Sequence, residues 1–259
     1  AHGTTQATNA LLEGDVAKVG VVTLGQGLEG AKSKSDTTIG SIELAPKKYL
    51  ESENVYVETT AADLEAAIRN ALEQLKEKDC KSFVAAEAFS VDNPEHENRT
   101  VALCREDNIP GTATNDISKL YGLKIRTRTA VVNASIMPKM LEAATMTDES
   151  IKAAGIQSPL MVMRCDGGVM TVGEVRNRPI LTILSGPAAG VAGALMYEKL
   201  TDGLFFEVGG TSTDISCVKD GKVMIRYAEV GGHKTYLNSL DVRTVGIGGG
   251  SMVEIKGGK

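Results

Sequence analysis

The segment at residues 205–216 constrains the fold of this chain more than any other. An apolar run that ends at Glu207 is joined by a turn to a second run that begins at Asp214. The turn contains two glycines and three hydroxyl residues: Gly209, Gly210, Thr211, Ser212 and Thr213. Glycines let backbone N–H groups approach an anion, and hydroxyls add further donors. The pattern predicts two strands joined by a phosphate-binding turn, and an ordinary tight hairpin is the alternative.

The two acids that flank this turn are candidates for metal binding and catalysis. Carboxylate oxygens coordinate Mg²⁺, directly or through water, beside nucleotide phosphates. We therefore expect Glu207 and Asp214 to hold Mg²⁺ or to position the attacking group.

Two further glycine-rich segments carry weaker signals. Gly248, Gly249 and Gly250 follow a predicted strand, and their amides are expected either to meet a phosphate or substrate carbonyl or to allow a crowded strand crossing. Asp166 ends another strand and precedes two glycines. It is a candidate general base or orienting group, because strand ends border ligands in α/β sheets, and a turn cap is the alternative.

The composition favours α/β layers and excludes several functions. With 28 Gly, 4 Phe and no Trp, the interior has to be built from small and branched aliphatic side chains. A formal net charge of -5 disfavours a nucleic-acid partner, since phosphate backbones attract basic patches. Three histidines are too few for a histidine-rich dinuclear metal centre.

Cysteine spacing and hydropathy indicate the compartment. No Cys-x-x-Cys pair is present, so reduced core thiols are expected at Cys80, Cys104, Cys165 and Cys217. No apolar run approaches the about 18 residues of a membrane span. The sequence therefore predicts a cytoplasmic protein with no membrane partner.

Periodicity indicates alternating helices and strands. Helices are predicted at residues 4–12, 61–78, 93–107, 126–144 and 188–199. A kink or a break is expected at Pro138, and Ser185 is expected to cap the last helix. Strands are predicted at residues 17–23, 82–89, 159–165, 204–208, 214–219, 222–230 and 241–245. Asp220-Gly221 signals a hairpin turn, and residues 25–60 show no regular pattern.

Seven segments together resemble the hydantoinase/oxoprolinase family of ATPases. The turn at residues 209–214 is similar to the second phosphate loop of that family. The other segments follow in the family's order, at residues 2–11, 93–97, 132–134, 166–168, 185–190 and 246–251. This resemblance implies an α/β, actin-like (ribonuclease-H-like) ATPase with mixed sheets flanked by helices. It also implies two lobes, a partial one at residues 1–178 and the start of a second at residues 179–259.

The resemblance implies a function and its cofactors. Family members use ATP and Mg²⁺ to phosphorylate the carbonyl oxygen of a cyclic amide such as a hydantoin or 5-oxoproline, working with a hydantoinase B-like subunit. This chain has no Asp-Gly-Gly-Thr segment before His2, and only 35 residues separate Gly210 from Gly246. We therefore expect it to be truncated at both ends and to lack turnover when isolated. Glu207 stands where the family carries aspartate, and its extra methylene is expected to shift the metal.

Three alternatives remain open on the sequence. Instead of a hydrolase subunit, the chain is a ketone carboxylase ATPase subunit, an ATP-driven activator or reactivase, or a nucleotide-binding module without turnover. The scattered cysteines give little support to an activator with a cysteine-ligated iron–sulfur cluster.

Overall fold

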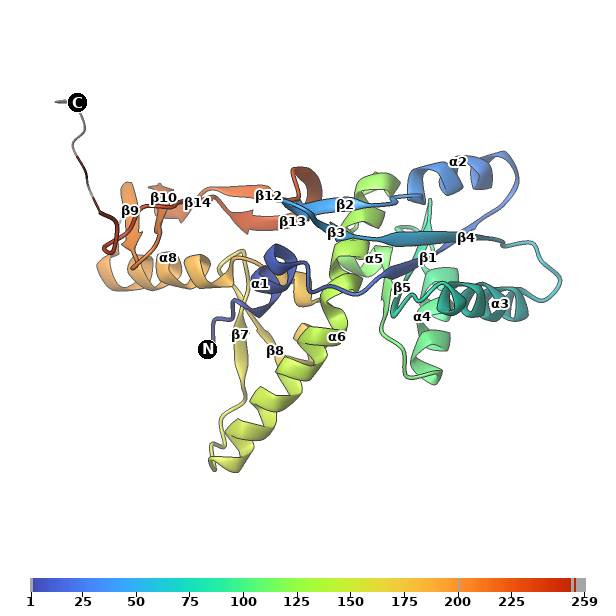
Figure 1. Ribbon diagram of the computed structural model, residues 1–259, viewed down its shortest axis with the longest axis horizontal. Coiled ribbons are helices and arrows are strands. Elements are labelled where there is room, and N and C mark those ends of the chain that lie inside the picture. Colours follow the sequence, from blue (N-terminus) through green and yellow to red (C-terminus); the bar gives the residue numbers. More distant parts are fainter. Residues whose placement is uncertain (1, 200, 253, 255–259) are drawn as a thin grey trace.

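A four-stranded parallel sheet organises the first half of the chain (Figure 1). The computed structural model describes residues 2–199, 201–252 and 254. The strand order is β4-β1-β5-β6, and all three pairings are parallel. The strands are β1 Val19–Gly25, β4 Ser52–Glu58, β5 Ser82–Glu87 and β6 Gly111–Ala113. Every residue of β1 is buried, as expected for a central strand covered on both faces.

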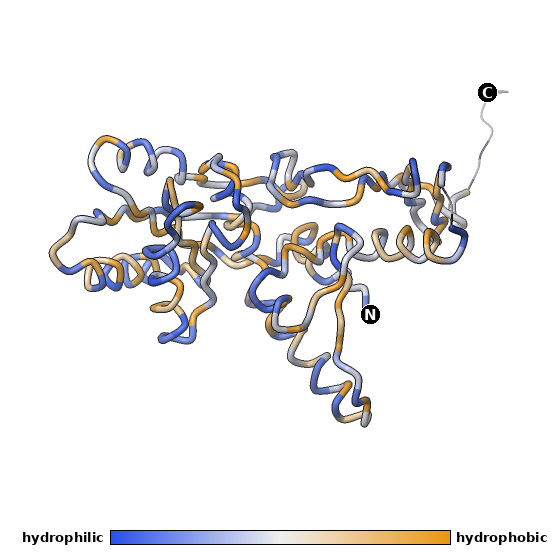
Figure 2. Tube along the Cα trace, turned by 180° about the vertical axis from the view of Figure 1, so that it is seen from behind, coloured by the Kyte–Doolittle hydropathy of each residue, from blue (hydrophilic) through white to orange (hydrophobic). Residues whose placement is uncertain are grey.

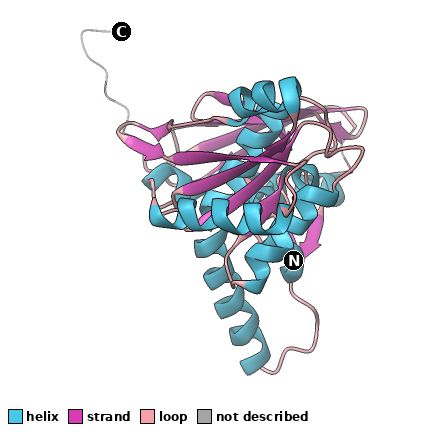
Figure 3. Cartoon of the chain, turned by 90° about the vertical axis from the view of Figure 1, so that its right-hand side faces the viewer, coloured by secondary structure: helices cyan, strands magenta, loops and turns pink. Residues whose placement is uncertain are grey.

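Helices cover both faces of this sheet (Figure 3). On one face, α3 Leu64–Glu77 and α4 Glu95–Glu106 pack on a cluster that includes Val22 and Phe83. The other face is covered by α1 Gln6–Glu13 and α6 Leu123–Ala153, with α2 Gly27–Thr37 beside α6. The four-residue helix α5 Thr114–Ile117 follows β6 directly.

Of the kink or break predicted at Pro138, the break is wrong, because α6 runs through this residue without interruption. Proline removes one backbone N–H donor from a helix interior. Residues 130–137 and Met140 are buried, and apolar residues on both sides of Pro138, such as Ile136 and Met140, belong to the main core. Their burial outweighs the lost hydrogen bond, so tertiary packing overrides the local preference.

The region from residue 25 to residue 60 is more regular than its sequence indicates. It contains α2, the short antiparallel pair β2 Ile42–Ala45 and β3 Lys48–Leu50, and the sheet strand β4. Polar residues are common in β4, whose burial is mostly intermediate, so it lacks the apolar run by which buried strands are recognised.

The second half of the chain contains smaller sheets and one long apolar helix. The hairpin β7 Met161–Met163 and β8 Val169–Thr171 is followed by α7 Val172–Asn177, a 3₁₀ turn at Pro179–Thr182 and α8 Ser185–Glu198. The last strands are β9 Gly203–Val208, β10 Thr213–Lys219, β11 Lys222–Val223, β12 Ile225–Val230, β13 His233–Leu240 and β14 Val242–Val245. The sequence did not predict β13.

Strands β9, β10, β11 and β14 form one sheet, with β10 pairing with each of the other three. The hairpin predicted at Asp220-Gly221 is confirmed. Both residues have positive φ, 52° and 69°, as the tightest hairpin turns require. Figure 2 allows the hydropathy of α8 and of these strands to be followed along the chain.

The main hydrophobic core spans both halves. It contains Ala7, Val84 and Ile136 together with Ile183 and Leu237. The lobe boundary near residue 179 stays a prediction, and the core runs across that position. None of the helices in the described part of the chain combines the length and apolar character needed to cross a membrane.

The cysteines are free, and three of the four are buried as predicted. Burial raises the pKa of Cys104 and of Cys165 to about 12, which keeps both thiols protonated and unreactive. Cys217 is the exception, since it lies exposed on β10 and is no core residue.

Candidate functional site

The turn between β9 and β10 is tight and open to solvent on its outer side. The two strands are in register, with Val208 opposite Thr213. The Gly209 N–H donates to the Ser212 carbonyl at 2.9 Å and closes the turn. Gly209, Gly210 and Thr211 are exposed. A small anion could therefore reach the turn from solvent.

The second glycine cluster lies against this turn. The Gly249 N–H donates to the Gly209 carbonyl and the Gly250 N–H to the Gly210 carbonyl, each at 2.8 Å. The Thr213 hydroxyl donates to the carbonyl of Ile247 at 2.7 Å. The structure therefore brings together two glycine-rich segments that the sequence analysis treated separately.

Crowding explains why glycine is needed at residue 248. A Cβ atom there would lie 2.6 Å from the Gly209 carbonyl oxygen and 2.8 Å from the Ser212 nitrogen, both backbone atoms. The Gly248 N–H donates to the Ser251 hydroxyl at 3.0 Å. The amides of Gly248, Gly249 and Gly250 all have protein acceptors, and those of Gly249 and Gly250 hold the second cluster against the β9–β10 turn. Its contact with phosphate stays a prediction.

The two predicted acids lie side by side on one face of the sheet. Glu207 is directly opposite Asp214 across β9 and β10, and Asp214 is opposite Thr244 on β14. The Thr244 hydroxyl donates to Asp214 Oδ1. Directly opposite residues of antiparallel strands have Cβ atoms about 5 Å apart, so both carboxylates can reach one ligand.

Helix α8 lies close to Glu207, one member of this acidic pair. A Cβ atom at Gly190 would lie 2.1 Å from Glu207 Oε2 and 3.5 Å from the ring of Phe205. Glycine at this position therefore leaves room for the Glu207 carboxylate between the helix and the sheet. No local pattern in the sequence connects Gly190 with Glu207.

The donor set fits Mg²⁺ when phosphate oxygens complete it. Mg²⁺ prefers oxygen ligands and is usually held by one or two carboxylates together with phosphates and water. Glu207 and Asp214 supply two such carboxylates. Among residues 2–199, 201–252 and 254, no group of three or more His, Cys, Asp or Glu side chains is placed to hold a metal by itself.

Asp166 lies apart from this hairpin, in the turn between β7 and β8. Its carboxylate pairs with Arg164, and its Oδ1 accepts the Gly168 N–H at 3.0 Å. The neighbouring Gly167 lies next to Leu240 at the end of β13. These contacts are those of a turn cap, and a catalytic role for Asp166 stays a prediction.

The start of α8 joins the N-terminal segment to the site. The fully buried Ser185 hydroxyl donates to the Thr4 carbonyl at 3.0 Å and accepts the Thr4 N–H at 3.3 Å. The helix cap itself is Leu184, which has a φ of 58°. The prediction that Ser185 caps α8 is therefore wrong, because its hydroxyl is engaged by a segment 181 residues away.

A buried polar network lies at the carboxyl ends of β5 and β6, and the sequence analysis missed it. Glu97 is fully buried, and its carboxylate accepts hydrogen bonds from four donors. They are the Glu87 N–H at 2.8 Å, the Thr114 hydroxyl at 2.5 Å, and the Asn115 backbone and side-chain N–H groups at 2.9 and 2.8 Å. The clustered acids at residues 93–97 were the available signal.

Arg126 extends this network into α6. Its guanidinium is fully buried and donates to Thr114 Oγ1 at 2.9 Å, to the Glu87 carbonyl at 2.6 Å and to the Leu120 carbonyl at 2.7 Å. Burial lowers the pKa of Arg126 from its ordinary value. Thr114 thus bridges a buried carboxylate and a buried guanidinium, and both charges are extensively hydrogen-bonded as burial requires.

Glu87 and His96 form a pair beside that network. The His96 Nδ1 lies 3.0 Å from Glu87 Oε1. Burial raises the pKa of Glu87, partly offset by His96. Within the part of the chain that the structure describes, Glu87 Oε2 is buried without a hydrogen-bond partner.

Sequence comparisons match almost the whole chain. The profile of the family described as "Hydantoinase/oxoprolinase" matches residues 126–259, and that of the "Hydantoinase/oxoprolinase N-terminal region" matches residues 1–107. The chain is 26% identical over 284 residues to caprolactamase subunit alpha of Pseudomonas jessenii, which covers 98% of this chain and 39% of that protein. It is 26% identical over 206 residues to the acetophenone carboxylase gamma subunit of Aromatoleum aromaticum. This match covers 74% of this chain and 28% of that protein.

The fold is also found in a solved structure. The ATP-dependent caprolactamase from Pseudomonas jessenii superimposes with a TM-score of 0.72 at 26% identity, over 98% of this chain and 40% of that one. The predicted α/β, actin-like ATPase fold class is confirmed. The chain spans less than half the length of the relatives that it matches.

Proposed function

Because this chain belongs to the hydantoinase/oxoprolinase family, we propose that it forms part of the nucleotide-binding site of an ATP-dependent enzyme that activates a cyclic amide. In this proposal, the turn at residues 209–213 holds phosphate oxygens, and Glu207 and Asp214 hold Mg²⁺. The substrate is a lactam, hydantoin or related ring whose carbonyl oxygen receives the phosphoryl group.

The chemistry explains why such an enzyme needs ATP. Amide resonance makes a ring carbonyl a poor electrophile, and phosphorylation of its oxygen turns that oxygen into a leaving group. Mg²⁺, when bound, supplies charge stabilisation for the phosphates. The chain's own contribution is to position the phosphates with backbone N–H and hydroxyl donors, which cost no reorganisation during reaction.

One observation carries this proposal: two carboxylates in register lie beside a glycine and hydroxyl turn. Glu207 and Asp214 lie directly opposite each other on β9 and β10, which supports a shared ligand. Thr244 holds Asp214 in place by donating to its carboxylate. Within residues 2–199, 201–252 and 254, neither carboxylate forms an ion pair, which favours a divalent cation. The adjoining exposed turn offers donors for the phosphates that accompany it.

The test is calorimetric titration with Mg²⁺-ATP on two matched glycine variants. Gly248→Ala forces a Cβ atom against backbone atoms of the turn, while Gly246→Ala meets nothing within 4 Å. We expect Gly248→Ala to weaken binding at least about tenfold, or by about 1.4 kcal/mol, and Gly246→Ala to leave it unchanged. Equal affinities for both variants and the unmodified chain would contradict a phosphate site at this turn.

Turnover is tested separately by phosphate release with 5-oxoproline, hydantoin and acetone added in turn. Release stimulated by a cyclic amide supports the hydrolase. Nucleotide binding without release under any condition supports a binding module without turnover. ATP turnover that none of the three compounds changes, together with copurification of a large enzyme, supports an activator.

A ketone carboxylase ATPase subunit is the second candidate. The match to the acetophenone carboxylase gamma subunit favours it. A ketone also presents a carbonyl oxygen that phosphorylation would activate. Phosphate release stimulated by acetone and bicarbonate, and not by lactams, distinguishes it from the hydrolase.

We also propose that a second, hydantoinase B-like subunit completes the reaction. Two relatives are described as subunits, alpha in the caprolactamase and gamma in the acetophenone carboxylase. Phosphate release that rises when such a subunit is added, with ring-opened product formed only in its presence, is the expected result.

A further inference from the structure

A cavity of about 330 Å³ lies among the start of α1, the middle of α6, β7 and α7. Its walls are largely apolar, and the side chains that matter most are Met140, Ala143, Met146, Leu160, Val162 and Val175. This volume is at the lower end of the range for small-molecule sites, which are typically about 300–1,000 Å³. The size and lining favour a compact, mostly apolar ligand.

Uncharged polar side chains line this cavity mainly from one short segment, since Thr147 on the α6 side donates its hydroxyl to the Ala143 carbonyl. His2, Thr4 and Gln6 all line it, and they alternate along the chain that leads into α1. The backbone of this segment is fixed, because the His2 N–H donates to the Met161 carbonyl at 2.7 Å and the Met163 N–H donates to the His2 carbonyl at 2.9 Å. One wall therefore offers hydroxyl, amide and imidazole groups to a polar atom of the ligand.

The charges at the cavity do not favour an anion. Lys139 lines it but pairs with Asp15, and this contact raises the pKa of Lys139. Glu142 also lines the cavity and adds a negative charge. A ligand carboxylate would meet a cation that already has a partner, with another carboxylate close by, so an uncharged ligand is preferred.

Helix α8 connects this cavity to Glu207. Thr4 in the cavity wall is hydrogen-bonded to Ser185, the first residue of α8. Gly190, against which the Glu207 carboxylate packs, follows five residues later. At about 1.5 Å per residue, these two contacts are separated by about 7.5 Å along the helix axis. The cavity and the proposed phosphate site therefore share one rigid support.

We propose that this cavity binds the uncharged apolar ring of a lactam or cyclic ketone, with the carbonyl directed to the wall formed by His2, Thr4 and Gln6. The choice of this substrate class rests on the proposed function. It narrows that function, because the carboxylate-bearing 5-oxoproline is disfavoured against an unsubstituted lactam.

The test uses methionine methyl NMR on the chain without nucleotide. Met140 and Met146 line the cavity, whereas Met196 is an exposed residue of α8 outside it. We expect saturable shifts of the Met140 and Met146 methyl signals on titration with ε-caprolactam or cyclohexanone. The Met196 signal should stay in place, and 5-oxoproline should produce no saturable shift.

A filled cavity provides the matched control. Ala143→Phe places a ring in the cavity, while Ala153→Phe makes the same change on an exposed residue of the same helix. We expect the first to raise the apparent Kd for caprolactam at least about tenfold and the second to leave it unchanged. If Ala143→Phe does not fold, the titration of the unmodified chain decides.

Absence of a saturable shift at both cavity methyls overturns the proposal, as does an equal response to 5-oxoproline. Because nucleotide is absent, this result is independent of the Mg²⁺-ATP titration. Binding of caprolactam without binding of Mg²⁺-ATP would support the proposal for the cavity and contradict the proposal for the phosphate site. Binding of Mg²⁺-ATP without binding of caprolactam would support only the proposal for the phosphate site.

Discussion

The parallel sheet and the β9–β10 hairpin region differ sharply in how well they are covered. All seven residues of β1 are buried, whereas five of the six residues of β9 are exposed. Phe83 on β5 is 1% exposed and Phe206 on β9 is 55% exposed. The first region has helices on both faces, while the second is covered by α8 on the face that carries Glu207.

This difference separates stability from proposed function. The parallel sheet buries its apolar side chains within the chain, so its packing contributes strongly to the folding free energy. The hairpin region contains the proposed ligand groups and leaves apolar side chains such as Leu204 and Val208 exposed. Substitutions should therefore affect stability mainly in the first region and ligand binding mainly in the second.

The largest expected effect is on stability and comes from comparing a Phe→Ala substitution in the parallel sheet with one in the hairpin region. Phe83→Ala removes a buried ring from the packed cluster under α3 and should lower the free energy of unfolding by about 3–5 kcal/mol. Phe206→Ala removes a half-exposed ring and should cost less than about 1 kcal/mol. Urea denaturation measures both. Similar losses for the two variants would show that the regions are equally well packed.

The next effect concerns the buried network at the end of the parallel sheet. Glu97→Gln replaces one of two acceptor oxygens with an NH₂ group that faces existing donors. We expect a loss of about 2–3 kcal/mol in urea denaturation. Glu95→Gln, an exposed change on the same helix, should be nearly neutral. A neutral Glu97→Gln would mean that the network contributes nothing to stability.

A smaller effect is expected in the hairpin region, on binding instead of folding. Gly190→Ala places a Cβ atom 2.1 Å from the present position of Glu207 Oε2, so the flexible carboxylate has to move. Mg²⁺-ATP affinity should fall about tenfold, or about 1.4 kcal/mol, with little change in the melting temperature. Gly193→Ala, which meets nothing within 4 Å, is the control. Unchanged affinity would remove Glu207 from the metal site.

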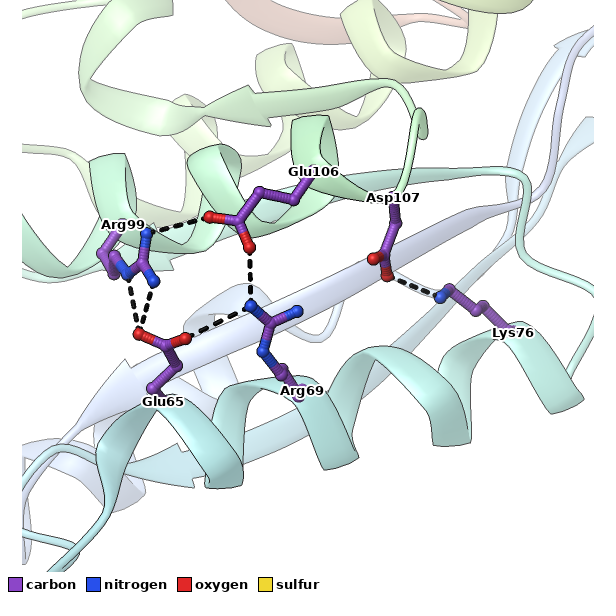
Figure 4. A network of polar contacts seen from close by, with 6 residues as sticks. All are labelled: Glu65, Arg69, Lys76, Arg99, Glu106 and Asp107. Atoms are coloured by element: carbon purple, nitrogen blue, oxygen red, sulfur yellow. Dashed lines mark hydrogen bonds and ion pairs between the residues drawn. The ribbon is translucent and has the colours of Figure 1, made fainter.

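The smallest effect is expected from the ion pairs between α3 and α4 (Figure 4). Glu65 pairs with Arg99 and Arg69, and Glu106 pairs with both arginines, all at the surface. Hydrogen bonding to Arg99, supported by Arg69, lowers the pKa of Glu65 below its ordinary value of 4.5. The stabilisation is therefore present above pH 4.5 and is lost as the pH falls through the lowered pKa.

Thermal melts of Glu65→Gln at low salt test this sign. The variant should melt slightly below the unmodified chain at pH 7, and the two should converge at low pH and at high salt. A difference that grows as the pH falls would show that Glu65 is not stabilised in its ionised form.

Local patterns were sufficient for elements whose sequence carries one clear period. The helix predicted at residues 61–78 is α3, and the run at residues 82–89 contains β5. Two features failed for the same reason. Pro138 continues a helix and Ser185 does not cap one, since in both cases distant contacts outweigh the local preference. Strands β4 and β13 were not predicted, because each mixes polar and apolar residues.

The candidate site divides in a similar way. The residues of the β9–β10 turn could be selected from their types and spacing alone, although their role is still a proposal. The residues that contact this turn and its acids in the folded structure could not be selected in this way. Gly249 contacts Gly209, Thr244 contacts Asp214, and Gly190 makes room for Glu207, all through packing between separate segments.

By itself, the sequence determined the α/β class, the main helices and the position of the turn, because these depend on periodicity and on glycine within a few neighbouring residues. Only the tertiary structure decided which segments meet: α8 packs beside Glu207, Thr4 bonds to Ser185, and an apolar cavity forms at the N-terminal segment. Such contacts depend on the packing of residues far apart in the chain. A local pattern carries no information about which distant residues will pack together.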